Sequence, residues 1–140
     1  MLGELTKEQS FQVLKSEVMG RIGCYDADGG VYIVPITYVF DCKFIYAHSK
    51  EGLKIQLMRK NPRVCFQVDC IENMANWRSV IAWGEYEELK GNNYDKAMKI
   101  LKDRLAPLMI SESVKSSLGP TLSRNCGQAI QSCRLQDFHK

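Results

Sequence analysis

The chain has 140 residues, of which 45% are hydrophobic and 25% charged, a composition that fits one globular domain and excludes a disordered protein. Its net charge of +3 argues against a nucleic-acid or membrane partner, although it suits a ligand that carries phosphate. The longest uncharged apolar run is too short to cross a bilayer, and the polar N-terminus predicts no signal peptide. We therefore expect one cytoplasmic domain over residues 1–140.

The cysteine and histidine content argues against a metal site. Six cysteines occur without a C-x-x-C pair, and only two histidines could complete a zinc site. Without a secretory signal, we expect reduced thiols of the kind found in cytosolic proteins.

A helix is predicted near the N-terminus. Thr6 and Gln9 match a capping box, in which each side chain accepts from the other residue's backbone N–H. Phe11, Leu14 and Val18 follow at helical spacing, so we expect a helix from Thr6 to about Met19 that packs through this face.

Two strands follow, joined by a strong turn signal. The residues 26–30, Asp-Ala-Asp-Gly-Gly, separate strands predicted at Gly20–Tyr25 and Val31–Phe40, which should pair as a hairpin. The second strand is apolar on both faces, which indicates burial on both sides or closure into a barrel. Pro35 cannot donate to a ladder, so its position is an edge, a bulge or a barrel corner.

The stretch Val34–Lys54 is the most informative. A turn at residues 41–43 leads into a strand at Phe44–Ala47, and a helix at Glu51–Arg59 follows, which Asn61-Pro62 ends. We expect Leu53, Leu57 and Met58 to point inward from this helix. The polar residues between strand and helix can hold an anion, because free N–H groups and the positive end of the helix dipole point at it.

The rest of the chain predicts further strands and one helix. Gly84 interrupts a long strand and indicates a bulge. The segments are a strand at Val64–Val68, a loop at Glu72–Asn76, a strand at Trp77–Leu89, an amphipathic helix at Asn93–Leu108, a mobile loop at Ser111–Asn125 and a strand at Gln128–Asp137. This order predicts a mainly β fold, a small antiparallel barrel with helices at its margins.

Few residues point to chemistry by themselves. His48 lies at a strand end beside Ser49, with Gly52 and Lys54 close behind, and each also has an ordinary structural interpretation. His139 is a tail residue. The sequence contains no nucleophile–histidine–acid order, phosphate loop or dinucleotide fingerprint, so a cofactor would have to carry any redox chemistry.

Five segments in a fixed order resemble a known family. It is the flavin-binding split-barrel family related to pyridoxamine 5'-phosphate oxidase, in the branch of nitroimidazole-resistance (Nim-type) proteins. The segments are Gly20-Arg21-Ile22-Gly23, Val34-Pro35-Ile36-Thr37-Tyr38, Ile45-Tyr46-Ala47-His48-Ser49 with Gly52 and Lys54, Asn61-Pro62-Arg63-Val64-Cys65-Phe66, and Trp77-Arg78-Ser79-Val80 with Gly84.

This resemblance implies a six-stranded split barrel that forms a homodimer, with one FMN in each of two clefts shared by the subunits. Lys54 matches the lysine that holds the phosphate, and residues 77–80 match a strand that the other subunit contributes. The implied flavin-binding residues are Pro35, Ile36, Thr37, Tyr38, His48, Ser49, Gly52, Leu53, Lys54, Trp77, Ser79 and Val80. His48 is the implied proton donor.

The chain departs from the oxidase itself. Leu53 stands where the oxidase has an arginine. The substrate-binding arginine and histidine motif at the C-terminus of the oxidase has no counterpart in Ser123–Lys140 of this chain. We therefore expect an FMN-dependent oxidoreductase of the nitroreductase kind, acting on a small planar acceptor. The alternatives are a flavin- or haem-binding module without turnover and a structural dimer with an empty cleft.

Overall fold

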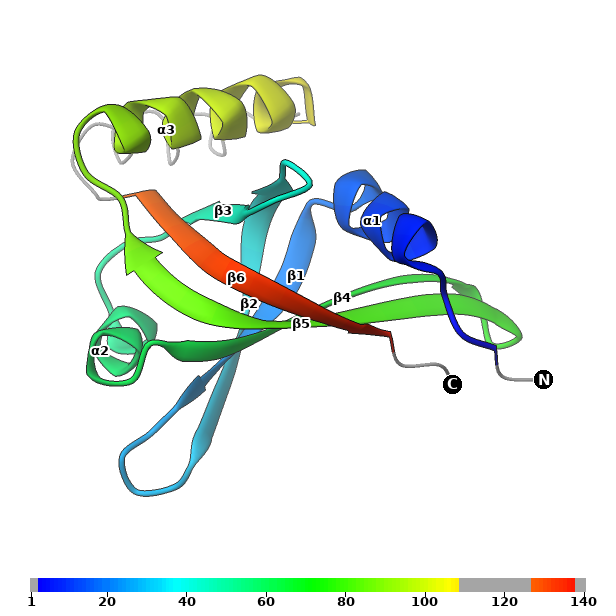
Figure 1. Ribbon diagram of the computed structural model, residues 1–140, viewed down its shortest axis with the longest axis horizontal. Helices are drawn as coiled ribbons and strands as arrows, with labels where there is room; N and C mark the ends of the chain where they lie inside the picture. Colours follow the sequence, from blue (N-terminus) through cyan, green and yellow to red (C-terminus); the bar gives the residue numbers. More distant parts are fainter. Residues whose placement is uncertain (1–2, 109–126, 138–140) are drawn as a thin grey trace.

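The computed structural model describes residues 3–108 and the backbone of residues 127–137 (Figure 1). Strands make up most of it, with helices at the margins. The elements are α1 (Lys7–Ser16), β1 (Met19–Tyr25), β2 (Val31–Phe40), β3 (Ile45–His48), α2 (Leu53–Lys60), β4 (Arg63–Asn73), β5 (Asn76–Glu88), α3 (Asn92–Leu105), a 3₁₀ turn η1 (Ala106–Leu108) and β6 (Gly127–Asp137).

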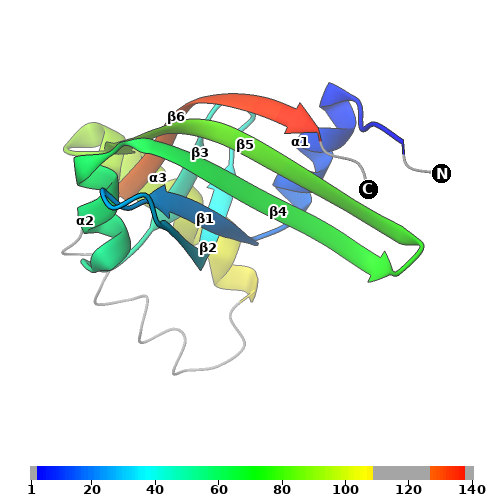
Figure 2. The same ribbon diagram turned by 90° about the horizontal axis from the view of Figure 1, so that it is seen from below.

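The strands close into an antiparallel barrel in the order β1-β2-β3-β6-β5-β4. The interior holds alternate residues of β1 to β5, among them Ile22, Phe66 and Val80, as the period of two in a strand requires. The hairpin of β4 and β5 extends past the barrel in both ribbon views (Figures 1 and 2). The fold predicted from the sequence, a mainly β antiparallel barrel with flanking helices, is confirmed.

The pairing of β2 shows whether Pro35 lies at an edge, a bulge or a barrel corner. From Val31 to Thr37 this strand pairs with β1, and it pairs with β3 only from Tyr38 to Phe40. Among the described strands, the first part of β2 therefore has an open edge, and Pro35 lies on it. The edge interpretation is confirmed, whereas burial on both faces is wrong for this part, because Val31 and Ile33 are each 63% exposed.

Two helices cover the barrel as their patterns predicted. Thr6 and Gln9 form the capping box of α1, with Thr6 Oγ1 accepting from the Gln9 N–H at 3.2 Å. The apolar stripe of α3 is buried through Ala97, Met98, Leu101 and Leu105. In Figure 1, α3 lies along one side of the barrel and α1 near one end.

Several predicted boundaries were wrong. The first helix ends at Ser16 rather than Met19, because Met19 pairs with Thr37 at the start of the β1–β2 ladder. The fourth strand continues past Val68 to Asn73, because its residues keep pairing with β5. The bulge expected near Gly84 is confirmed by a shift in the register between β5 and β6 at Trp83/Glu85. The loop predicted at Ser111–Asn125 lies outside the described residues.

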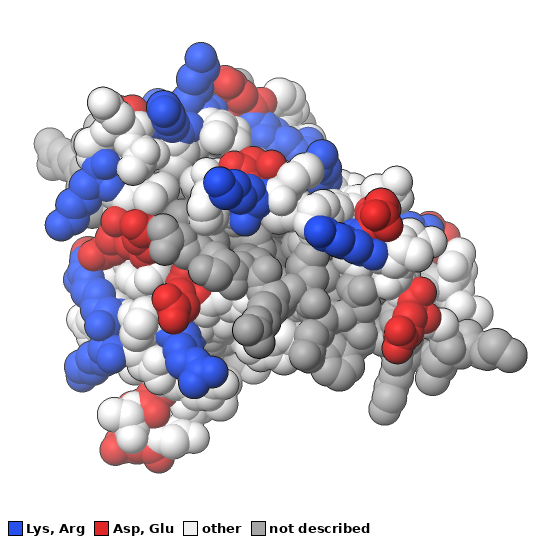
Figure 3. Space-filling model, viewed as in Figure 1, with Lys and Arg blue, Asp and Glu red and all other residues white. Residues whose placement is uncertain are grey.

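The surface mixes charges of both signs. On the face shown in Figure 3, basic and acidic side chains of the described residues alternate over short distances. No helix in the described part of the chain is both long enough and apolar enough to cross a membrane.

Candidate functional site

The polar segment between β3 and α2 forms the centre of the candidate site. It begins at His48, the last residue of β3, and ends at Gly52, the N-cap of α2. Among the residues whose side chains the structure describes, none caps α2, so its first N–H groups keep their capacity to donate to an anion. A Cβ placed on Gly52 would meet nothing within 4 Å, which shows open space directly beside these N–H groups.

Lys54 differs from the other lysines of the described residues. It is half-buried on the first turn of α2, whereas every other described lysine is exposed. It forms no ion pair with any carboxylate of the described residues. Burial raises the pKa of the Cys24 thiol, and the positive charge of Lys54 lowers it in part. A half-buried cation without a carboxylate partner suits a phosphate.

His48 and Ser49 are held within the segment. Ser49 is 9% exposed, and its hydroxyl donates to the Lys50 carbonyl at 3.1 Å. His48 is half-buried, and its Nε2 atom is buried. The role of His48 as a proton donor stays a prediction. Leu53, expected to point inward, is 51% exposed, because the buried face of α2 is formed by Ile55, Leu57 and Met58.

The predicted flavin-binding residues of β2 point to two different sides. Ile36 and Tyr38 are buried in the barrel, so only their backbone could meet a ligand. Pro35 and Thr37 lie on the outer face, where Pro35 is exposed and Thr37 half-buried. The outer face of this strand is therefore the one that can contact a bound molecule through side chains.

The predicted residues of β5 divide in the same way. Val80 is fully buried in the barrel, whereas Trp77 and Ser79 are half-buried on the outer face. Ser79 Oγ accepts a hydrogen bond of 3.0 Å from Gln67 Nε2, and the same Gln67 nitrogen donates to Asp69 at 3.0 Å. This polar group of neighbouring strands fixes the position of Ser79.

The barrel keeps the predicted flavin-binding residues of β2 apart from those of β5. In the closed ring, β2 and β5 are separated by two strands in either direction, β3 and β6 on one side and β1 and β4 on the other. Side chains on the outer faces of opposite strands point away from each other. Because β2 pairs with β3, the structure brings His48, the last residue of β3, next to β2, whereas Trp77 and Ser79 lie on a strand at the opposite side of the ring.

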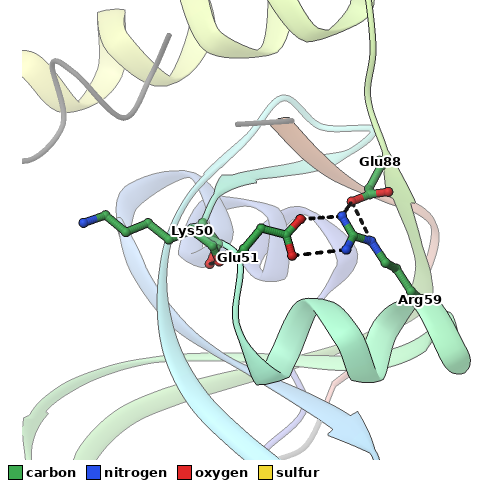
Figure 4. A network of polar contacts seen from close by, with 5 residues as sticks. Lys50, Glu51, Arg59 and Glu88 are labelled. Atoms are coloured by element: carbon green, nitrogen blue, oxygen red, sulfur yellow. Dashed lines mark hydrogen bonds and ion pairs between the residues drawn. The ribbon is translucent and has the colours of Figure 1, made fainter. Parts of the chain in front are cut away.

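An ion-pair network beside the site was missed by sequence reasoning. The Arg59 guanidinium donates to both carboxylate oxygens of Glu51, at 3.1 and 2.6 Å, and to Oε1 of Glu88, at 3.1 and 2.6 Å (Figure 4). The hydrogen bonds from Arg59 lower the pKa of Glu88, and those to Glu88 and Glu51 raise the pKa of Arg59. In the sequence Glu51 and Arg59 are eight residues apart, and this spacing does not indicate a side-chain contact along a helix.

The geometry defines a class of protein: a small antiparallel barrel with an uncapped helix start that follows its third strand. Residues 6–121 match the family described as pyridoxamine 5'-phosphate oxidase. That match covers most of the chain, and the protein belongs to this family. The family relationship inferred from the five segments is confirmed, whereas the Nim-type branch stays a prediction.

The chain is also similar to a curated relative and to solved structures. An uncharacterized protein, RA0666, of Rhizobium meliloti (strain 1021) is 35% identical over 85 residues, which cover 61% of this chain and 56% of that protein. The crystal structure of a FAD-binding protein from Mesorhizobium loti is 28% identical with a TM-score of 0.77, and the match covers 100% of this chain and 99% of that chain.

A proposed 5-nitroimidazole antibiotic resistance protein from Bacteroides thetaiotaomicron has the same fold. It is 17% identical with a TM-score of 0.75, over 99% of this chain and 89% of that chain.

Proposed function

We propose that this protein is an FMN-dependent oxidoreductase of the cytoplasm that works as a homodimer and reduces a small planar acceptor such as a nitroaromatic compound. The observation that carries the proposal is Lys54, a half-buried lysine at the start of α2 that pairs with no carboxylate of the described residues. Membership of the pyridoxamine 5'-phosphate oxidase family and the similarity to a FAD-binding protein support a flavin as the ligand.

The residues around α2 fit the phosphate end of FMN. Lys54 would supply a charge-assisted hydrogen bond, and the N–H groups after Gly52 would supply others. The space beside Gly52 leaves room for phosphate oxygens. The outer face of β2, with Pro35 and Thr37, would then lie along the rest of the cofactor.

A second copy of the chain would complete the site. In this proposal Ser79 and Trp77 face the segment 48–54 from another molecule, and the place of β2 and β5 on opposite sides of the ring supports this arrangement. The exposed apolar residues Val31 and Ile33 on β2 supply surface that a partner could bury. We therefore propose two shared sites per dimer.

The bound flavin would supply the redox chemistry, by accepting electrons from a reduced donor and passing them to the acceptor. The protein would hold the phosphate through Lys54 and orient the ring against β2. His48 would donate a proton to the reduced acceptor, as its place between β3 and the phosphate-binding segment allows. The unbonded thiols of Cys24, Cys42, Cys65 and Cys70 agree with a reducing compartment.

The absorbance spectrum of the purified protein tests the proposal. We expect flavin absorbance, or its appearance when FMN is added to protein that was purified without cofactor. We also expect a reduced donor and a nitroaromatic to be consumed in equal amounts. A colourless protein that binds no added FMN would contradict the proposal, and a Soret band would indicate a haem-binding module instead.

A further inference from the structure

Glu51 lies where it could compete with an anionic ligand. It directly precedes Gly52, the N-cap of α2, and stands three residues before Lys54. A carboxylate this close to the helix start can accept from the free N–H groups of the first turn, and its side chain is near enough along the chain to reach Lys54. Either contact would occupy the groups that the proposed function assigns to phosphate.

The structure shows the Glu51 carboxylate engaged elsewhere. Both of its oxygens accept from Arg59, which lies in the last turn of α2, and Arg59 is also held by Glu88 at the end of β5. In Figure 4 the side chain of Glu51 points toward Arg59, while that of Lys50 points to the opposite side. A bidentate arginine–carboxylate pair fixes the orientation of both groups.

We propose that Arg59 is a positioning residue that holds the Glu51 carboxylate away from Lys54 and thereby keeps the phosphate site open. This inference rests on the proposed function, because it concerns how tightly that site binds a phosphate-bearing flavin. Arg59 does not touch the ligand itself. Glu88 supports it by fixing the guanidinium from the other side.

Loss of Arg59 should lower the affinity only for a flavin that carries a phosphate. When Arg59 is replaced, Glu51 turns to Lys54 and to the N–H groups of α2, and it repels the phosphate. FMN binding weakens for this reason, whereas riboflavin, which has the same ring system without a phosphate, keeps its affinity. Replacing Glu51 as well removes the competing carboxylate and restores FMN binding.

The experiment measures dissociation constants for FMN and riboflavin by quenching of flavin fluorescence. The variants are Arg59→Met, Glu51→Gln, the double variant and Lys60→Met. Lys60 is exposed and forms no ion pair among the described residues. Lys60→Met is therefore the control for lost charge, because it removes one positive charge beside Arg59 without affecting Glu51. Circular dichroism confirms that each variant is folded.

We expect Arg59→Met to raise the Kd for FMN roughly fivefold, the size of a surface charge interaction. Lys60→Met should bind FMN as the wild type does, Glu51→Gln should bind it no more weakly than the wild type, and the double variant should recover most of the loss. Unchanged FMN affinity in Arg59→Met, an equal loss for riboflavin, or a double variant that stays weak would overturn the inference while the proposed function stands. Failure of the wild type to bind any flavin would overturn both.

Discussion

The hydroxyl of Tyr38, a residue of β2, donates a 2.7 Å hydrogen bond to the backbone carbonyl of Leu14 in α1. Both residues are fully buried, and the Tyr38 ring packs edge-on against Phe66 with the ring centroids 4.7 Å apart. Burial and the nearby Glu17 raise the pKa of Tyr38, so the hydroxyl stays protonated and donates. This bond joins the first helix to the barrel wall.

Replacing Tyr38 by phenylalanine should lower the free energy of unfolding by about 1–3 kcal/mol, because the buried Leu14 carbonyl loses its side-chain donor. Urea unfolding measures the change. Tyr25→Phe is the matched control, since Tyr25 is 45% exposed. Equal stability of the two variants would show that water satisfies the carbonyl in place of Tyr38.

Gly20→Ala should destabilise the barrel by overpacking. A Cβ at Gly20 would lie 2.3 Å from Cζ of Phe66 and 3.0 Å from the backbone oxygen of Gln67, and the Phe66 ring is buried against Tyr38. We expect a loss of about 1–3 kcal/mol in urea unfolding. Gly23→Ala, whose nearest contact is 3.6 Å, should cost less, and Phe66→Leu should partly rescue the Gly20 variant. A Gly20→Ala protein as stable as Gly23→Ala would contradict this account.

Lys54→Ala should weaken FMN binding by about 1.5–3 kcal/mol, the range of hydrogen bonds to charged groups. Fluorescence titration gives the affinity, and riboflavin binding should change little. Lys60→Ala, on the exposed side of α2, serves as the control for lost charge. No difference between the two variants would mean that Lys54 is an ordinary surface cation.

Glu88 should give the protein a pH dependence at acid pH. Arg59 lowers the pKa of Glu88 in the folded protein below its unfolded value of roughly 4.3. A carboxylate with a lowered pKa stabilises the fold above the unfolded pKa, and this contribution is lost as the pH falls through the folded pKa.

Wild type should therefore be more stable than Glu88→Gln at pH 7, and the difference should shrink as the pH falls below about 4. Urea unfolding at several pH values measures this. Glu85→Gln, at an exposed position on the same strand, is the control. A difference that stays constant over the whole pH range would exclude the ionised Glu88 as its source.

A shared site can be tested by mixing two defective chains. Lys54→Ala removes the proposed phosphate contact, and Ser79→Leu alters the opposite wall, so each homodimer should bind FMN poorly. Co-expressed heterodimers isolated with two affinity tags should bind one FMN per dimer, because one of their two sites combines the intact parts. Heterodimers that bind no more FMN than either homodimer would show that each site lies within one chain.

Local signals in the sequence predicted much of the fold. The capping box at Thr6 and Gln9, the turn at residues 26–30 and the apolar stripe of α3 depend on near neighbours, and all three are confirmed. In β5 the same alternation of side chains places Val80 inside the barrel and Trp77 and Ser79 on its outer face. These features follow from backbone geometry that repeats over a few residues.

Contacts between distant residues could not be predicted in the same way. The pattern of α2 did not show that Leu53 is exposed, because the direction of its buried face depends on how the helix packs on β1. The network joins Glu51 before α2, Arg59 in α2 and Glu88 in β5. No regular spacing in the sequence indicates that these residues meet. For the site, the sequence predicted the position of Lys54 but gave no information on its burial.

The open edge of β2 has a further consequence. A row of unpaired backbone groups invites an additional strand from another molecule, and this is a common route to aggregation. Pro35 lies within that row, and proline in a sheet is found where its nitrogen faces the open side, so the edge lacks a donor near its middle. A strand from another molecule that paired with this edge would therefore lack a hydrogen bond at Pro35, which favours association through side chains such as Val31 and Ile33 instead.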